Sequence, residues 1–164
     1  MSRTSYRQTY EKISAPFRTS ENVMNMVRLM DQVLTYMMYV LYPMLLVILL
    51  FRHDEHLMKA VLIPGTGFVL VTLIRSAINR PRPYAAHRIP AIIHKDKQGE
   101  SMPSRHAFSA AVISMAYYAV FPAAGIVLLV LSALECVVRV IGGVHYPEDV
   151  IIGYLAGVIM GIFI

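Results

Sequence analysis

The longest uncharged stretch near the start of the chain limits the fold more than any other feature. Residues 33–51 contain no charged side chain, and most of them are large and apolar. A helix needs about 20 mostly apolar residues to cross the hydrocarbon core of a membrane. The sequence therefore predicts a membrane-spanning helix here. Pro43 should kink this helix without ending it, because neighbouring helices can satisfy the freed carbonyl.

Further apolar runs along the chain predict further spans. Of the 164 residues, 57% are hydrophobic and only 15% are charged, which excludes an ordinary soluble domain. The predicted fold is therefore all-α, an integral membrane bundle of about five transmembrane helices. The expected spans are residues 33–51, 57–79, 103–121, 123–140 and 147–164.

The uncharged run 107–134 decides how the ends of these spans are arranged. It is long enough for one tilted helix or two short ones, and the stretch FPAAG at 121–125 favours a turn in its middle. If the run forms two helices, one membrane face holds four of these ends: the end of the second span, the start of the third, the end of the fourth and the start of the fifth. With one helix, a rise of about 1.5 Å per residue would place His106 and Arg139 on opposite faces.

The N-terminal part of the chain has a different character. Residues 22–34 carry apolar side chains at helical spacing, with polar residues elsewhere around the helix. We expect an interfacial amphipathic helix within an N-terminal basic segment of residues 1–31, followed by a membrane domain of residues 32–164. The N-terminal segment lacks the short apolar core of a cleaved signal peptide, so we expect it in the mature protein.

The shared membrane face collects the residues that can carry chemistry. Several arginines, which stay charged and present forked donors, favour a tetrahedral oxyanion such as phosphate as the ligand. The pair Pro103-Ser104 opens an apolar run, so it should supply a helix N-terminus whose N–H groups add to anion binding. Two histidines, His106 and His145, allow one to attack phosphorus while the other protonates the leaving oxygen. Asp149, four residues after His145, is placed to hold that imidazole in the attacking tautomer.

Three short motifs together carry a family resemblance. They are Arg75-x6-Arg82-Pro83, then Pro103-Ser104-Arg105-His106, then Arg139-x5-His145-x3-Asp149. In order and spacing they resemble the signature of the type 2 phosphatidic acid phosphatase superfamily, over roughly residues 57–164. That family includes lipid phosphate phosphatases, bacterial phosphatidylglycerophosphate and undecaprenyl pyrophosphate phosphatases, soluble class A acid phosphatases and vanadium haloperoxidases.

The resemblance implies a role for each residue of the motifs. His145 matches the family nucleophile that forms a phosphohistidine, Asp149 its orienting carboxylate, and His106 the general acid. The implied phosphate ligands are Arg75, Arg82, Ser104, Arg105 and Arg139. Three positions depart from the family pattern: Arg75 stands where Lys is usual, Arg105 where Gly is usual, and Val138 where Ser is usual.

The resemblance also implies an activity and a location. We expect a phosphatase that crosses the cell membrane several times, with its active site at one membrane-water interface. Its substrate would be a lipid phosphate, or a polyprenyl phosphate or pyrophosphate, hydrolysed without a metal or other cofactor. The positive-inside rule places the basic face in the cytoplasm, whereas many relatives act on the outer face, so both orientations stay open.

Other functions fit the sequence less well. A noncatalytic lipid-phosphate binder or transporter on the same scaffold would not need His106, His145 and Asp149 together. A vanadate-dependent oxidase is disfavoured by the membrane spans and by the lack of a large soluble domain. The net charge of +5 comes without a recognisable nucleic-acid-binding module, so we expect no nucleic-acid partner.

The remaining polar residues are expected to have ordinary roles. Arg80 should extend to the membrane interface. Glu135 lies within an apolar helix and is costly unless paired, and Arg139 is a candidate partner. Glu100 and Ser101 come just before Pro103 and could belong to the mouth of the site, but we do not include them among the predicted site residues. The other histidines lack metal-ligand spacing and should be solvated; they are His53, His56, His87 and His94.

Overall fold

The chain is all-helical, as predicted. The computed structural model describes residues 3–164, and this part of the chain contains helices and no strands. The elements are α1 (Arg3–Ser14), a 3-10 helix η1 (Ala15–Arg18), α2 (Glu21–Phe51), α3 (His56–Ile78), α4 (Pro83–His87), α5 (Arg105–Val120), α6 (Pro122–Ile141) and α7 (Pro147–Gly161).

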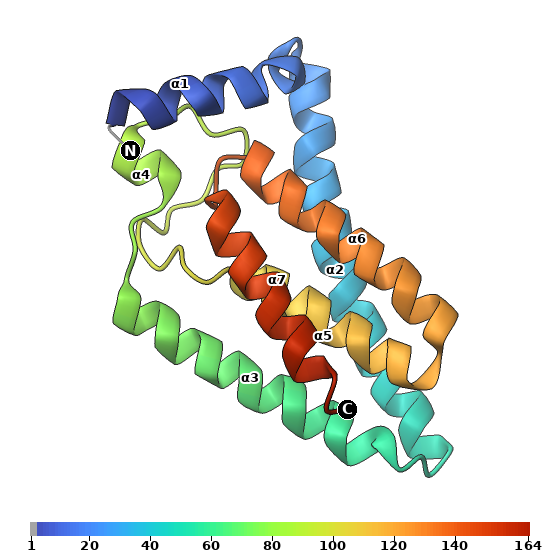
Figure 1. Cartoon of the computed structure of the whole chain (residues 1–164). Coiled ribbons are helices and arrows are strands. Elements are labelled where there is room, and N and C mark those ends of the chain that lie inside the picture. The colour runs from blue at the N-terminus through green and yellow to red at the C-terminus, as the bar shows by residue number, and fades with distance from the viewer. Residues whose placement is uncertain (1–2) are drawn as a thin grey trace.

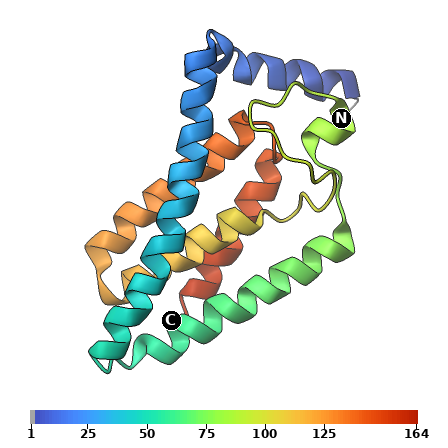
Figure 2. The same cartoon turned by 180° about the vertical axis from the view of Figure 1, so that it is seen from behind.

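The long helices form one bundle around α5. This helix packs against α2, α3, α6 and α7, and most of its residues are buried. The helices α2 and α3 meet at the 52–55 connection and spread apart toward their other ends, with α5 between them (Figures 1 and 2). Because the middle helix is enclosed by the other four, its first turn at residues 105–108 is held deep at one end of the bundle.

Within residues 3–164, three stretches are long and apolar enough to cross a membrane. They are α2, the stretch 56–87 that begins with α3, and α6. The helices α5 and α7 have 16 and 15 residues, short of the length that a full span needs. The expected count of five spans therefore stays a prediction. Large apolar side chains that would face lipid are exposed on all four outer helices, among them Val33, Val40, Val47, Leu62, Val69, Leu73, Val130, Val137, Ile151 and Ile159.

The predicted turn in the run 107–134 is present. The helix α5 ends at Val120, Phe121 leaves the helical conformation with φ −132° and ψ 79°, and α6 begins at Pro122. Proline suits a first helical position because its missing N–H would have no partner there. At Gly125, a Cβ atom would lie 2.3 Å from the Cα of Tyr118, so only glycine lets α6 return this closely along α5.

Residues 22–34 are helical, as their spacing predicts, but they do not form a separate element. The helix α2 runs without interruption from Glu21 to Phe51, so no break occurs at the boundary expected between residues 31 and 32. The side chain of Ser20 caps its start by accepting a hydrogen bond from the Val23 N–H at 3.4 Å. The helix also continues through Pro43, as expected. A further helix, α1, lies within the basic N-terminal segment.

Three glycines allow α7 to pack closely on α5. Gly153, Gly157 and Gly161 are all buried and recur every four residues on one face of α7. A Cβ at Gly153 would lie 2.4 Å from the backbone oxygen of Ser104, and one at Gly157 would lie 2.5 Å from that of Phe108. Small residues at this spacing let helix backbones approach in membranes.

The helix α1 lies across the end of the bundle where α6 ends and α7 begins (Figure 1). The Tyr10 hydroxyl donates a hydrogen bond to the Ile141 carbonyl at 3.0 Å. The ring of Tyr6 stacks on His87 at 4.5 Å and meets Tyr146 edge-on at 5.0 Å. His87 is therefore packed against aromatic rings, and the expectation of a solvated histidine was wrong there. A cavity of about 550 Å³ remains between α1 and the start of α7.

Candidate active site

The three motifs meet at one end of the bundle. They come from the end of α3 and the following loop, from the start of α5, and from the last turn of α6 with the 142–146 connection and the first turn of α7. The backbone ties these segments together: the Ser104 N–H donates to the Asp149 carbonyl at 2.8 Å, and the Ile93 N–H donates to the Gly142 carbonyl at 3.1 Å. The long 88–104 loop is thus fixed against both the α6 and the α7 sides of the site.

His145 and Asp149 form the centre of the site. Both are 0% exposed, and His145 Nδ1 lies 3.6 Å from Asp149 Oδ2. Asp149 stands in the first turn of α7, where Oδ2 also accepts a hydrogen bond from the Tyr146 N–H at 3.0 Å. Among the residues that the structure describes, His145 Nε2 has no hydrogen-bond partner. The second ring nitrogen is therefore available for a ligand.

The surroundings of His145 favour the neutral imidazole. Burial, together with the charges of Arg82 and Arg139, lowers its pKa to about 4, although Asp149 opposes the shift. At neutral pH the imidazole carries one proton, and its other nitrogen keeps a lone pair.

Two residues outside the predicted site hold Asp149. Ser101 is 0% exposed, and its hydroxyl donates a hydrogen bond to Asp149 Oδ2. Arg80 Nη1 donates to Asp149 Oδ1 at 3.0 Å, and its other end pairs with Glu148. The expectation that Arg80 would extend to the interface was wrong, because its side chain turns back to a buried carboxylate. The motif spacing gave no signal for either residue.

Arg75 and Arg82 brace the segment that precedes α5. Both are buried. Arg75 Nη1 donates to the Pro103 carbonyl at 3.3 Å, and its Nη2 donates to the Glu100 carbonyl. Arg82 Nε donates to the Gly99 carbonyl at 3.2 Å. The two guanidiniums thus reach the same short loop from the α3 side.

Ser104 has a structural task in addition to its predicted one. It is fully buried and stands at the N-cap of α5, where its hydroxyl accepts a hydrogen bond from the Ala107 N–H at 3.4 Å. A capped helix start next to buried arginines adds partial positive charge to the site.

Arg139 is held by two carboxylates. Its Nε lies 3.2 Å from Glu135, which confirms the expected pairing. Its Nη2 lies 3.1 Å from Asp31 and donates to the Thr35 hydroxyl at 2.9 Å. Asp31 and Thr35 come from α2, whose contribution to the site was not predicted. The phosphate-binding role of Arg139 stays a prediction.

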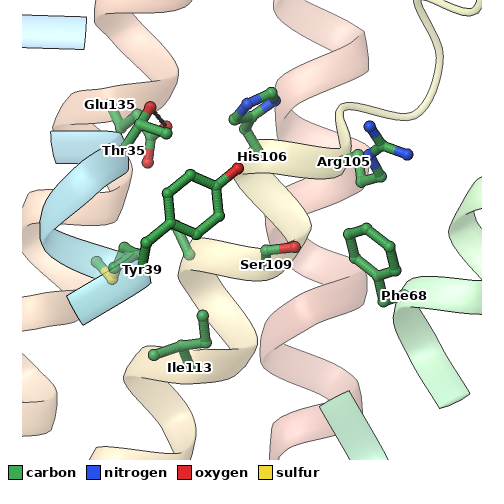
Figure 3. Close-up of a pocket in the computed structure, with 10 residues that line it drawn as sticks. Thr35, Tyr39, Phe68, Arg105, His106, Ser109, Ile113 and Glu135 are labelled. Carbon is green, nitrogen blue, oxygen red and sulfur yellow. Dashed lines mark hydrogen bonds between the residues drawn. The ribbon is translucent and has the colours of Figure 1, made fainter. Parts of the chain in front are cut away.

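His106 and Arg105 lie on the wall of a pocket of about 150 Å³ between α2, α3, α5 and α6 (Figure 3). The guanidinium of Arg105 lies over the ring of Phe68, 5.0 Å from its centroid. The ring of Tyr39 reaches into the same space from α2 (Figure 3). Ten residues line the pocket: Thr35, Met38, Tyr39, Phe68, Arg105, His106, Ser109, Ala110, Ile113 and Glu135. The pocket is mostly apolar and has the two basic residues on its wall.

The comparisons with known proteins agree with this arrangement. The model of the PAP2 superfamily matches residues 56–164, and the chain belongs to that family. It is therefore a membrane protein of the family that the three motifs indicate. A comparison with curated protein sequences gives no match.

Two solved structures resemble the chain in fold. The crystal structure of Aquifex aeolicus LpxE has a TM-score of 0.71 and 24% identity, covering 94% of this chain and 91% of that one. The structure of a transmembrane PAP2-type phosphatidylglycerolphosphate phosphatase from Bacillus subtilis has a TM-score of 0.59 and 19% identity, covering 98% and 92%. The similarity extends over nearly the whole chain, including the N-terminal helices that the family model does not match.

Proposed function

We propose that this chain is a membrane phosphatase that removes phosphate from a lipid through a phosphohistidine intermediate. One observation carries the proposal: a fully buried His145 keeps Nε2 free of partners among the described residues, while Asp149 lies behind its other nitrogen. A buried neutral imidazole that is oriented by a carboxylate suits a nucleophile. One of the two fold neighbours is a phosphatidylglycerolphosphate phosphatase by title, which supports the same class of substrate.

The first step would be an in-line attack of His145 Nε2 on phosphorus. The new P–N bond forms as the bond from phosphorus to the leaving oxygen breaks, and its electron pair stays on that oxygen. His106, at the start of α5, would supply the proton that the leaving oxygen needs. The positive charge that develops on the His145 ring is balanced by Asp149, and the charge on the phosphoryl oxygens by Arg75, Arg82 and Arg139.

The second step would release phosphate with water. His106, now neutral, takes a proton from the attacking water, the P–N bond breaks, and its electron pair returns to His145 Nε2. The proposed reaction uses arginines where a metal-dependent phosphatase uses a bound cation, so we expect it to need no metal.

Two of the cavities lie close to residues of the site and suit different parts of the proposed reaction. The pocket next to His106 is walled by apolar side chains such as Met38 and Ile113, which fits the part of the substrate nearest its tail. The larger cavity beneath α1 is lined by polar groups that include Arg80 and Glu148, which fits water and free phosphate. The helix α1 and the site lie at the same end of the bundle, as five spans would require. The substrate would therefore meet the site at one membrane-water interface.

Phosphate release from a panel of lipids in detergent tests the proposal. The panel contains phosphatidate, phosphatidylglycerophosphate, a polyprenyl phosphate and a polyprenyl pyrophosphate, with excess EDTA present throughout. We expect turnover of at least one lipid, inhibition by vanadate, and an acid-labile phosphoenzyme that His145→Ala abolishes. A strict requirement for added magnesium, or label trapped on the His145→Ala protein, would contradict the mechanism. Binding of a lipid phosphate without any turnover would favour a noncatalytic binder.

A further inference from the structure

A serine hydroxyl fills the space between the central histidine and its carboxylate. The imidazole has two oxygen neighbours at similar distances, and one of them is Asp149 Oδ2, which lies 3.6 Å from His145 Nδ1. Ser101 Oγ lies 3.5 Å from the same Nδ1 and donates a hydrogen bond to the same Oδ2. All three side chains are 0% exposed, so no bulk water competes for these contacts.

The carboxylate is fixed from several sides, so it is not free to swing toward the imidazole. Its Oδ2 accepts from Ser101 and from the Tyr146 N–H, and its Oδ1 accepts from Arg80 at 3.0 Å. The backbone holds the serine in turn, since the Ser101 N–H donates to the Arg80 carbonyl at 2.9 Å. The hydroxyl therefore has a defined position next to both groups.

We propose that Ser101 is a positioning residue that links Asp149 to His145 and selects the tautomer of His145 with its proton on Nδ1. A hydroxyl donates one hydrogen bond and accepts others, so Ser101 can donate to the carboxylate while it accepts from the imidazole Nδ1–H. This arrangement leaves the lone pair on Nε2, the nitrogen that has no hydrogen-bond partner among the described residues. The inference deepens the proposed function, since it concerns the nucleophile of that reaction.

Kinetics of Ser101→Ala test this role. We expect the rate of phosphoenzyme formation to fall by about 10–100-fold, as for other residues that orient a reactive ligand. The inhibition constant of vanadate should change little, because the phosphate ligands are untouched. Ser101→Thr, which keeps the hydroxyl, should recover part of the rate. Ser114→Ala serves as the matched control, because it also removes a fully buried serine hydroxyl, one that bonds only to the Ala110 carbonyl within α5.

A double-mutant cycle separates positioning from a general loss of packing. If Ser101 acts through the carboxylate, Ser101→Ala should cost almost nothing further in an Asp149→Asn background. Additive losses, or equal losses in Ser101→Ala and Ser114→Ala, would overturn the proposal.

A spectroscopic measurement tests the proposal without turnover. In isotope-labelled protein, the nitrogen resonances of the His145 ring report which nitrogen carries the proton. We expect the Nδ1–H form in the wild type and a mixture of tautomers in Ser101→Ala. The same tautomer in both proteins would refute the role of Ser101. Because this readout needs no substrate, it still applies if no lipid phosphate is hydrolysed, an outcome that would defeat the proposed function instead.

Discussion

Adding one methyl group at Gly153 should damage the site although no motif residue is replaced. In Gly153→Ala, the new Cβ would lie 2.4 Å from the Ser104 backbone oxygen, whereas ordinary contacts begin near 3.4 Å. A backbone atom cannot rotate away, so α7 and the start of α5 must separate by about 1 Å. This shift acts where the Ser104 N–H bonds the Asp149 carbonyl, and it moves Asp149 and His145 away from the start of α5.

The expected loss follows from the size of that shift. A displacement of about 1 Å in a catalytic group can cost about 100-fold in rate. Overpacking costs about 1–3 kcal/mol of stability. We therefore expect kcat for lipid phosphate hydrolysis to fall by about 100-fold, with a lower thermal unfolding temperature in detergent.

Two other glycines provide controls for this experiment. At Gly65 on α3, a Cβ would meet nothing within 4 Å. Gly65→Ala should keep full activity and gain up to about 1 kcal/mol from helix propensity. At Gly161, at the opposite end of α7 from the site, a Cβ would lie 2.2 Å from Met115 Cβ, so Gly161→Ala should lower stability more than activity. Wild-type kcat and stability in Gly153→Ala would refute the close-packing argument.

Three further predictions concern individual residues of the site. His106→Ala should lower the turnover rate by about 10²–10⁴-fold for a lipid phosphate but much less for an aryl phosphate, whose leaving group needs little protonation. Equal losses of rate for both substrates in phosphate-release assays would show that His106 is not the general acid. The pKa of His145 is lowered to about 4 from a usual value near 6.5, so the imidazole stays neutral over most of the acid range. After correction for substrate ionisation, kcat/KM should therefore stay level as pH falls from 7 to about 5. It should decline only as pH approaches about 4. An aryl phosphate, whose hydrolysis needs little help from His106, isolates the titration of His145. If kcat/KM for this substrate fell to half its maximum near pH 6.5, the result would contradict a buried neutral nucleophile. If Arg105 binds the second phosphate of a pyrophosphate, Arg105→Ala should raise the KM for a polyprenyl pyrophosphate by about tenfold and the KM for a monophosphate less, because a charge-assisted hydrogen bond would be lost. Arg52→Ala, which removes an arginine 5.8 Å from the Phe121 ring centroid, is the matched control. Equal changes in KM for both lipids would exclude this role of Arg105.

Those parts of the architecture that depend on local sequence could be predicted. Uncharged runs located the long helices, and the proline at 122 located the turn between α5 and α6. The spacing of four residues between His145 and Asp149 favoured a contact between them, and Asp149 lies in the first turn of α7 with His145 just before that helix. The closeness of these residues to Arg80 and Ser101 depends on how the 79–104 loop folds back, which no periodic pattern encodes.

Asp31 shows why some site residues escaped prediction. It lies in the first half of α2, where polar and apolar residues alternate at helical spacing. This sequence pattern is the same whether the carboxylate faces water or is paired inside the bundle. Glu135 lies in the middle of an apolar helix, where an unpaired charge is costly, so its pairing with Arg139 could be anticipated. The glycines of α7 are a different case, because their four-residue spacing was visible in the sequence.

The distribution of buried charge supports an anion site independently of the motifs. The buried arginines of the described residues are Arg75, Arg82 and Arg139, and the buried carboxylates are Asp31, Glu135 and Asp149.

These six charges are unevenly paired. Arg139 pairs with Asp31 and Glu135, and Asp149 pairs with the partly exposed Arg80. Arg75 and Arg82 have no carboxylate within 4.0 Å among residues 3–164, and they donate to backbone carbonyls of the loop before α5. Burying a cation without a counter-charge costs several kcal/mol, so such a pair is expected where an anionic ligand completes the balance. A phosphate bound between these two arginines and His145 Nε2 would neutralise the charges that the fold leaves unpaired.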